Sequence, residues 1–109
     1  MNEKYRIALS HFDQIARSET REWGDLQWHG EITNCDVCSR PMKGERYMID
    51  GPASLQSDPP WGNLCVVCAF KYSPNVGWGK AQLYEKSSSD RWKLISGGPL
   101  RELADDDWP

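Results

Sequence analysis

Two short stretches decide the fold, "TNCDVCSRPM" at residues 33–42 and "NLCVVCAFKY" at residues 63–72. They hold all four cysteines of the 109-residue chain, arranged as two C-x-x-C pairs. Two intervening residues let both sulfurs of a pair face one ion, and two such pairs supply the four thiolates that suit tetrahedral zinc. The spacing therefore predicts one Zn²⁺ per chain, with the ligands Cys35, Cys38, Cys65 and Cys68.

A four-thiolate site of this kind is expected to be structural. It leaves no open coordination position for water or substrate, so the metal holds the fold together. Its contribution to folding is on the order of 10 kcal/mol at neutral pH. A chain of 109 residues buries only a modest core, and small domains commonly need such a staple.

Other uses of the cysteines remain open. Iron bound as in rubredoxin needs the same four thiolates, although rubredoxins usually carry glycine after the second cysteine of each pair, where this chain has Ser39 and Ala69. Two disulfides are a second alternative. The N-terminal stretch shows no apolar signal segment, so we expect a cytoplasmic location, where thiols stay reduced. A thioredoxin-like redox pair would need a βαβ context that neither pair has.

The region of about residues 33–73 resembles the broad class of small four-cysteine zinc proteins, the treble clefs and zinc ribbons. A first knuckle, a hairpin and then a pair that opens a short helix is the order found in a treble clef, whereas a ribbon would place the second pair on another hairpin. The lack of glycine or proline from Cys65 to Ser73 favours the treble clef. The resemblance implies an α+β fold but no particular activity, because that class spans many functions.

An amphipathic helix is predicted over about residues 3–18. Apolar residues recur there at steps of three and four and form one stripe. We expect this stripe to pack against the metal-binding part, with a docking face for a partner as the alternative. The residues of the stripe are Tyr5, Ala8, Leu9, Phe12, Ile15 and Ala16.

The remaining pattern predicts short strands in a single domain. "ERYMID" (45–50) and "ASLQS" (53–57) indicate one hairpin, with a loop at 58–63, and "AQLYEK" (81–86) and "RWKLIS" (91–96) indicate another. The "GWGK" stretch between the helix and the second hairpin is expected to be a turn. The predicted organisation is one zinc-binding domain over residues 1–98, whose four-cysteine module spans about 33–98, and an acidic, mobile tail over 99–109.

The net charge and its distribution argue against a protein that binds nucleic acid through the phosphates. The net charge is −3, made of −2 over residues 1–34, +2 over 35–98 and −3 over 99–109. Zinc bound to four thiolates would add −2 and make the middle segment neutral. A nucleic-acid-binding zinc module therefore stays an alternative that the charge does not favour. No apolar run is long enough to cross a membrane, and mean hydropathy is −0.72.

One pattern suggests catalysis. His29 and Glu31 form an H-x-E, which, followed by the second cysteine pair, resembles the zinc-dependent deaminases. In that family a histidine and two cysteines hold a catalytic zinc while the glutamate transfers protons. Leu64 replaces the proline of the signature, and this interpretation leaves the first cysteine pair without a purpose. The remote alternative is thus a deaminase that uses His29, Glu31, Cys65 and Cys68.

Six tryptophans in so short a chain provide candidates for an interface. Exposed tryptophans act as anchors for protein partners, whereas buried ones complete a thin core. With no other catalytic set present, we expect a protein-interaction module and not an enzyme. A phage or mobile-element modulator of a host complex is the narrower hypothesis. The candidate interaction residues are Trp23, Trp28, Trp61 and Trp78, whereas Trp92 is expected on a strand face.

Overall fold

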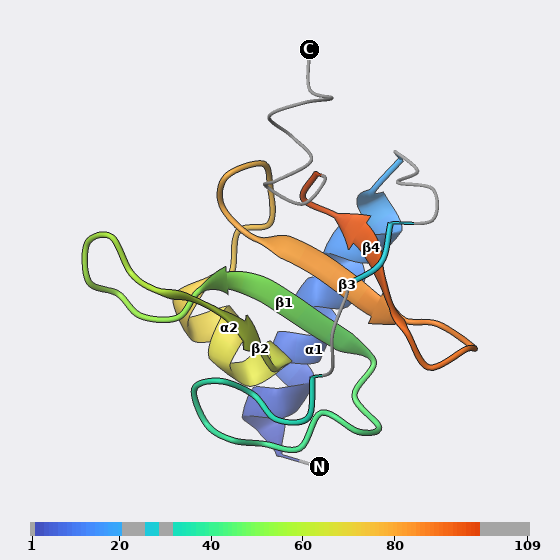
Figure 1. Ribbon diagram of the computed structural model, residues 1–109, viewed down its shortest axis with the longest axis horizontal. Helices are drawn as coiled ribbons and strands as arrows, with labels where there is room; N and C mark the ends of the chain where they lie inside the picture. The colour runs from blue at the N-terminus through green and yellow to red at the C-terminus, as the bar shows by residue number, and fades with distance from the viewer. Residues whose placement is uncertain (1, 21–25, 29–31, 99–109) are drawn as a thin grey trace.

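The computed structural model describes residues 2–20, 26–28 and 32–98. Neighbouring strands of its sheet run antiparallel in the spatial order β2-β1-β3-β4, and two helices accompany them (Figure 1). The fold is therefore α+β, as predicted. In chain order the elements are α1 (Glu3–Ser18), β1 (Tyr47–Pro52), β2 (Trp61–Leu64), α2 (Val66–Tyr72), β3 (Gln82–Lys86) and β4 (Trp92–Ser96).

Helix α1 occupies the predicted residues. Its first turn is capped by Asn2, whose side-chain oxygen accepts hydrogen bonds from the backbone N–H groups of Lys4 and Tyr5. Ala8 and Phe12 are completely buried, and the other residues of the apolar stripe pack against the core. The expectation that this stripe packs inward is confirmed.

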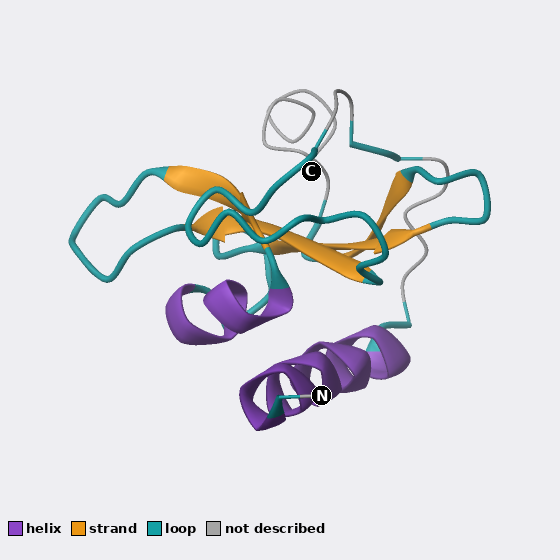
Figure 2. Cartoon of the chain, turned by 90° about the horizontal axis from the view of Figure 1, so that it is seen from below, coloured by secondary structure: helices purple, strands orange, loops and turns teal. Residues whose placement is uncertain are grey.

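Both helices lie on the same face of the sheet (Figure 2). The Tyr47 hydroxyl on β1 donates to the Asp13 carboxylate on α1, and the Ser73 hydroxyl at the end of α2 donates to the Pro52 carbonyl. These two bonds attach each helix to β1, next to the contact between the helices themselves. None of the described helices is long and apolar enough to span a membrane.

The first hairpin differs from the prediction. Strand β1 begins two residues later than predicted, and its partner is β2, which lies mostly in the stretch expected to be a loop. The predicted return strand, 53–57, instead belongs to the connection, which is closed by a hydrogen bond from Ala53 N to Pro60 O. The observed register sets Leu64 beside Ile49 in the core. The 53–57 stretch offers only Leu55, which is 76% exposed, so burial selects β2.

The second hairpin is confirmed, with β3 paired to β4. Trp92 is buried on its strand, as expected. Beyond β4, the backbone of residues 26–28 extends the sheet edge: Leu94 N donates to Leu26 O, and Trp28 N donates to Trp92 O. A single antiparallel bridge pairs Asn34 with Pro41, on either side of the first cysteine pair.

Candidate metal centre

The first cysteine pair lies in a tight turn closed by its own backbone. Ser39 N donates to Cys35 O at 2.9 Å, and Cys35 N donates to Arg40 O at 2.8 Å. Inside this turn the N–H of Val37 points at the Cys35 sulfur, with 3.5 Å between N and Sγ. A backbone amide directed at a sulfur stabilises the thiolate form, which is the form that binds a metal. Residues 35–40 therefore form a preorganised knuckle.

Ser39 occupies a glycine-like conformation in this knuckle. Its φ is +64°, in the left-handed region that side chains other than those of Asn and Asp rarely adopt. The chain needs this conformation to turn back after Cys38, which is the need that glycine meets in related knuckles. Ala69, the corresponding residue of the second pair, is helical and has no such need.

Replacing Ser39 with glycine is therefore expected to stabilise the protein by roughly 0.5–1 kcal/mol, because the left-handed strain disappears at a site where the serine hydroxyl makes no hydrogen bond to any of the described residues. The measurement is the urea midpoint of unfolding of the metal-loaded protein. Ala69→Gly is the matched control and should destabilise, since glycine inside a helix costs about 1 kcal/mol. A loss of stability in Ser39→Gly would contradict the interpretation.

The second cysteine pair straddles the start of α2. Cys65 is the residue before the helix, and its carbonyl accepts the first helical hydrogen bond, from Ala69 N at 2.9 Å. Cys68 follows three residues later, so its side chain lies on the same side of the first turn. Strand β2 ends directly before Cys65 and therefore fixes its position.

The knuckle is attached to β2 by one residue, Asp36. Its N–H donates to Asn63 O at 3.0 Å, and its carboxylate accepts from Asn63 N at 2.7 Å. The same side chain lies against Gly62, where an added Cβ would come within 3.1 Å of Asp36 Cβ and Oδ2. Because β2 leads into the second cysteine pair, this attachment brings the two pairs together.

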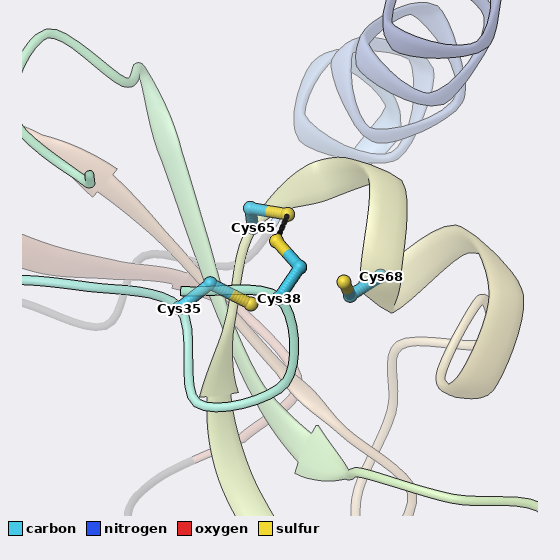
Figure 3. Close-up of side chains that lie close together, drawn as sticks. All are labelled: Cys35, Cys38, Cys65 and Cys68. Atoms are coloured by element: carbon cyan, nitrogen blue, oxygen red, sulfur yellow. Dashed lines mark hydrogen bonds between the residues drawn. The ribbon is translucent and has the colours of Figure 1, made fainter. Parts of the chain in front are cut away.

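The four sulfur atoms converge from these two segments (Figure 3). All lie within 4.8 Å of one another, and the Sγ atoms of Cys38 and Cys65 are 3.7 Å apart. Four sulfurs each about 2.3 Å from a central zinc ion would be roughly 3.8 Å apart at the corners of a tetrahedron. No disulfide links the four cysteines, and three are buried, with only Cys38 exposed. The structure thus arranges four cysteines to bind a metal ion.

The pKa values of these thiols indicate that a bound cation would be needed to keep all four in the thiolate form. Burial raises the pKa of Cys65 to about 11, and burial together with the neighbouring Cys38 raises the pKa of Cys68. Burial also acts to raise the pKa of Cys35, but backbone N–H groups, including that of Val37, outweigh it, so its pKa is lowered. Clustered thiolates repel one another, and the charge of a bound divalent cation offsets that repulsion, so the thiols release their protons when the metal binds.

The predicted interaction residues fall in different environments. Trp23 lies outside the described residues, and so do His29 and Glu31 of the H-x-E pattern. Trp28 is half-buried and contacts the Tyr84 ring edge-on, with centroids 5.9 Å apart. Among the described residues, the exposed tryptophans are Trp61, at 38%, and Trp78, at 46%.

Sequence reasoning missed the residue that joins the two halves of the centre, Asp36. Its place inside a C-x-x-C pair gave no signal of this role. Its role depends on β2 lying beside the knuckle, which cysteine spacing does not specify. The strained residue, Ser39, did carry a signal, since it follows the second cysteine of a knuckle.

Comparison of the chain with protein-family models, with curated proteins and with solved structures finds no match in any of the three. The metal centre is therefore supported by the geometry and chemistry of its own residues.

Proposed function

We propose that this chain is a zinc-stapled protein-interaction module of the treble-clef kind, working in a reducing compartment such as the cytoplasm. The observation that carries the proposal is the convergence of four thiols within 4.8 Å. Zinc fits this donor set because it prefers four thiolates in a closed tetrahedron, although iron can use the same ligands. Helix α2 opens at the second pair, as it does in a treble clef.

The surface proposed to bind a partner is at one end of the sheet. The β1–β2 connection and the loop between α2 and β3 both leave from this end (Figure 1). Three exposed apolar side chains belong to these two segments and to the first residue of β2, and we call them the sheet-end surface: Leu55, Trp61 and Trp78. Large exposed apolar side chains are typical of protein interfaces, where tryptophan contributes disproportionately to affinity. A narrower version of this proposal is that the protein is a phage or mobile-element modulator of a host complex. Its support is the small size and the tryptophan content of the chain.

A non-enzymatic role fits the use of the cysteines. A deaminase would take a histidine as the third ligand and leave one coordination position for water. Here Cys35 and Cys38 lie beside the second pair and can complete the coordination of the metal. The four-cysteine arrangement therefore gives the first cysteine pair a role as metal ligands, whereas the deaminase interpretation leaves that pair without a role.

The nucleic-acid alternative is weakened because several of the basic side chains are paired with carboxylates of the same chain. Arg46 lies 2.8 Å from Glu85 and 3.6 Å from Asp13. Lys86 lies 3.5 Å from Asp90, and Arg40 lies 4.0 Å from Glu45 and over the Tyr5 ring. Cations already paired to carboxylates release few counterions on binding phosphates, so they add little to nucleic-acid affinity.

Affinity for the partner is expected to fall when the tryptophan side chains of the sheet-end surface are truncated. The double variant Trp61→Ala/Trp78→Ala should bind a captured protein partner at least about thirtyfold more weakly, because tryptophan anchors are commonly worth 2 kcal/mol or more. The measurement is calorimetry with the purified partner after affinity capture and mass spectrometry.

Phe70→Ala is the matched control, because Phe70 is an equally exposed aromatic residue on α2; it should leave binding at the sheet-end surface unchanged, whereas a loss of affinity in this variant and not in the double variant would place the captured partner on the helices. Equal affinity of the double variant and the wild type would refute the surface. Binding of a single-stranded oligonucleotide that weakens steeply with salt would support the nucleic-acid alternative instead.

A further inference from the structure

A second surface lies on the outer side of the two helices. An open groove of about 500 Å³ is lined by residues spaced three and four apart along α1 and by one residue of α2. The groove therefore runs along the α1 axis. Its lining residues are Arg6, Ile7, Ser10, His11, Gln14 and Phe70. We call it the helix-face groove.

The groove has two exposed apolar side chains, and a histidine between them is fixed by its contacts. Ile7 is 49% exposed and Phe70 is 40% exposed, although neither belongs to the inward stripe of α1. Between them His11 is held in place, since its Nε2 lies 2.6 Å from Pro74 O and its ring meets the Phe70 ring edge-on at 5.1 Å. A preformed floor lowers the entropy cost of binding, which favours occupation of the groove.

The two helices that line the groove carry a net positive charge, on a chain whose net charge is −3. The two helices carry four cations, all exposed: Lys4, Arg6, Arg17 and Lys71. Their carboxylates are Glu3, which pairs with Arg6 at 3.4 Å on the surface, and Asp13, which bonds to Tyr47 on the sheet. Four cations against two carboxylates leave the two helices with a net charge of +2, which favours an acidic ligand.

We propose that the helix-face groove binds an acidic amphipathic helix of a partner protein. A helix lying along α1 can place apolar residues at i, i+3 and i+7 over Ile7 and Phe70, while its flanking carboxylates meet the cations. Charge of opposite sign then fixes the orientation and speeds association. This surface goes beyond the proposed function, because it is separate from the sheet-end surface and would let the chain join two proteins.

Two other occupants fit the observations less well. In a symmetric dimer each copy would present the same positive face to the other, so like charges would oppose. A membrane surface would need a broad apolar stripe to insert, whereas Ser10 and Gln14 lie among the apolar residues here.

The probe is a designed 20-residue helical peptide with leucine at heptad positions a and d and glutamate or aspartate elsewhere, titrated into the ¹⁵N-labelled, metal-loaded protein. We expect shifts centred on the amides of Ile7, His11 and Phe70. Phe70→Ala and Arg6→Glu should each weaken binding about tenfold or more. Both side chains are exposed, and circular dichroism with metal content verifies folding. Trp61→Ala is the matched control and should bind like the wild type.

Several results would overturn the proposal. They are equal affinity for the same peptide with lysine in place of its acidic residues, shifts centred away from the groove, or an unchanged affinity in both variants. Dimerisation through the groove in sedimentation would assign it to a second copy, and binding to phosphatidylserine vesicles without binding to the peptide would assign it to a lipid surface. Each outcome is independent of the Trp61/Trp78 experiment, so failure of one surface leaves the other standing.

Discussion

Removal of the metal is expected to unfold this protein. Four thiols, three of them buried, converge at one point. Without a cation the charged forms repel, while the protonated forms lose the four metal–sulfur bonds that join the two segments. Structural zinc contributes on the order of 10 kcal/mol of apparent folding free energy, comparable to the whole stability of a typical domain, about 5–15 kcal/mol. A strong chelator, or the double substitution Cys35→Ser/Cys38→Ser, should therefore abolish the cooperative thermal transition followed by circular dichroism.

Metal analysis makes this experiment decisive. We expect one zinc per chain in the wild type and none in the double variant, with a colourless solution; a red protein with iron would identify the rubredoxin-like alternative. Ser39→Gly serves as the control, since it changes the same knuckle without removing a ligand. If the double variant kept one zinc ion and its fold, Cys65 and Cys68 would have to use other ligands. His29 would then be the first to test, and the deaminase interpretation would gain support.

The metal centre was predictable because its determinants are local. A C-x-x-C pair makes its own turn, so spacing alone identifies Cys35 and Cys38 as neighbours, and the same holds for Cys65 and Cys68. The meeting of the two pairs was also expected, since tetrahedral zinc takes four thiolates and each pair supplies two. What spacing could not specify is the link between them. That link is the Asp36–Asn63 pairing, which depends on where β2 lies.

The strand partners were harder to predict for a related reason. Helix α1 shows a period over 16 residues, so many positions agree on one answer. Strand β2 has four residues, and two prolines precede it, so local propensity favours a loop. Its assignment comes from Leu64, which must lie beside Ile49 to be buried. Likewise, the helix-face groove depends on α2 bringing Phe70 near Ile7 and His11, which neither helix shows alone.

Gly97 is expected to be the most sensitive backbone position among the described residues outside the metal centre. Its φ is +105°, a conformation that other residues rarely adopt. A Cβ at this position would overlap the Ala81 carbonyl oxygen and lie 2.8 Å from Gln82 Cα. Both obstacles are backbone atoms at the start of β3, so they cannot rotate away. Gly97→Ala should therefore lower the free energy of unfolding by roughly 3–5 kcal/mol, as the sum of backbone strain and overpacking.

Gly79→Ala separates these two causes. Gly79 also has a positive φ, +75°, but a Cβ there would meet nothing within 4 Å. It should cost only the strain, about 1 kcal/mol, and the difference between the two variants measures the steric contact with the start of β3. Urea unfolding of both metal-loaded variants gives the comparison. Equal losses of unfolding free energy in the two variants would mean that the start of β3 and the end of β4 can move apart at little cost. The position of the β3–β4 hairpin would then depend on its turn and not on this close packing.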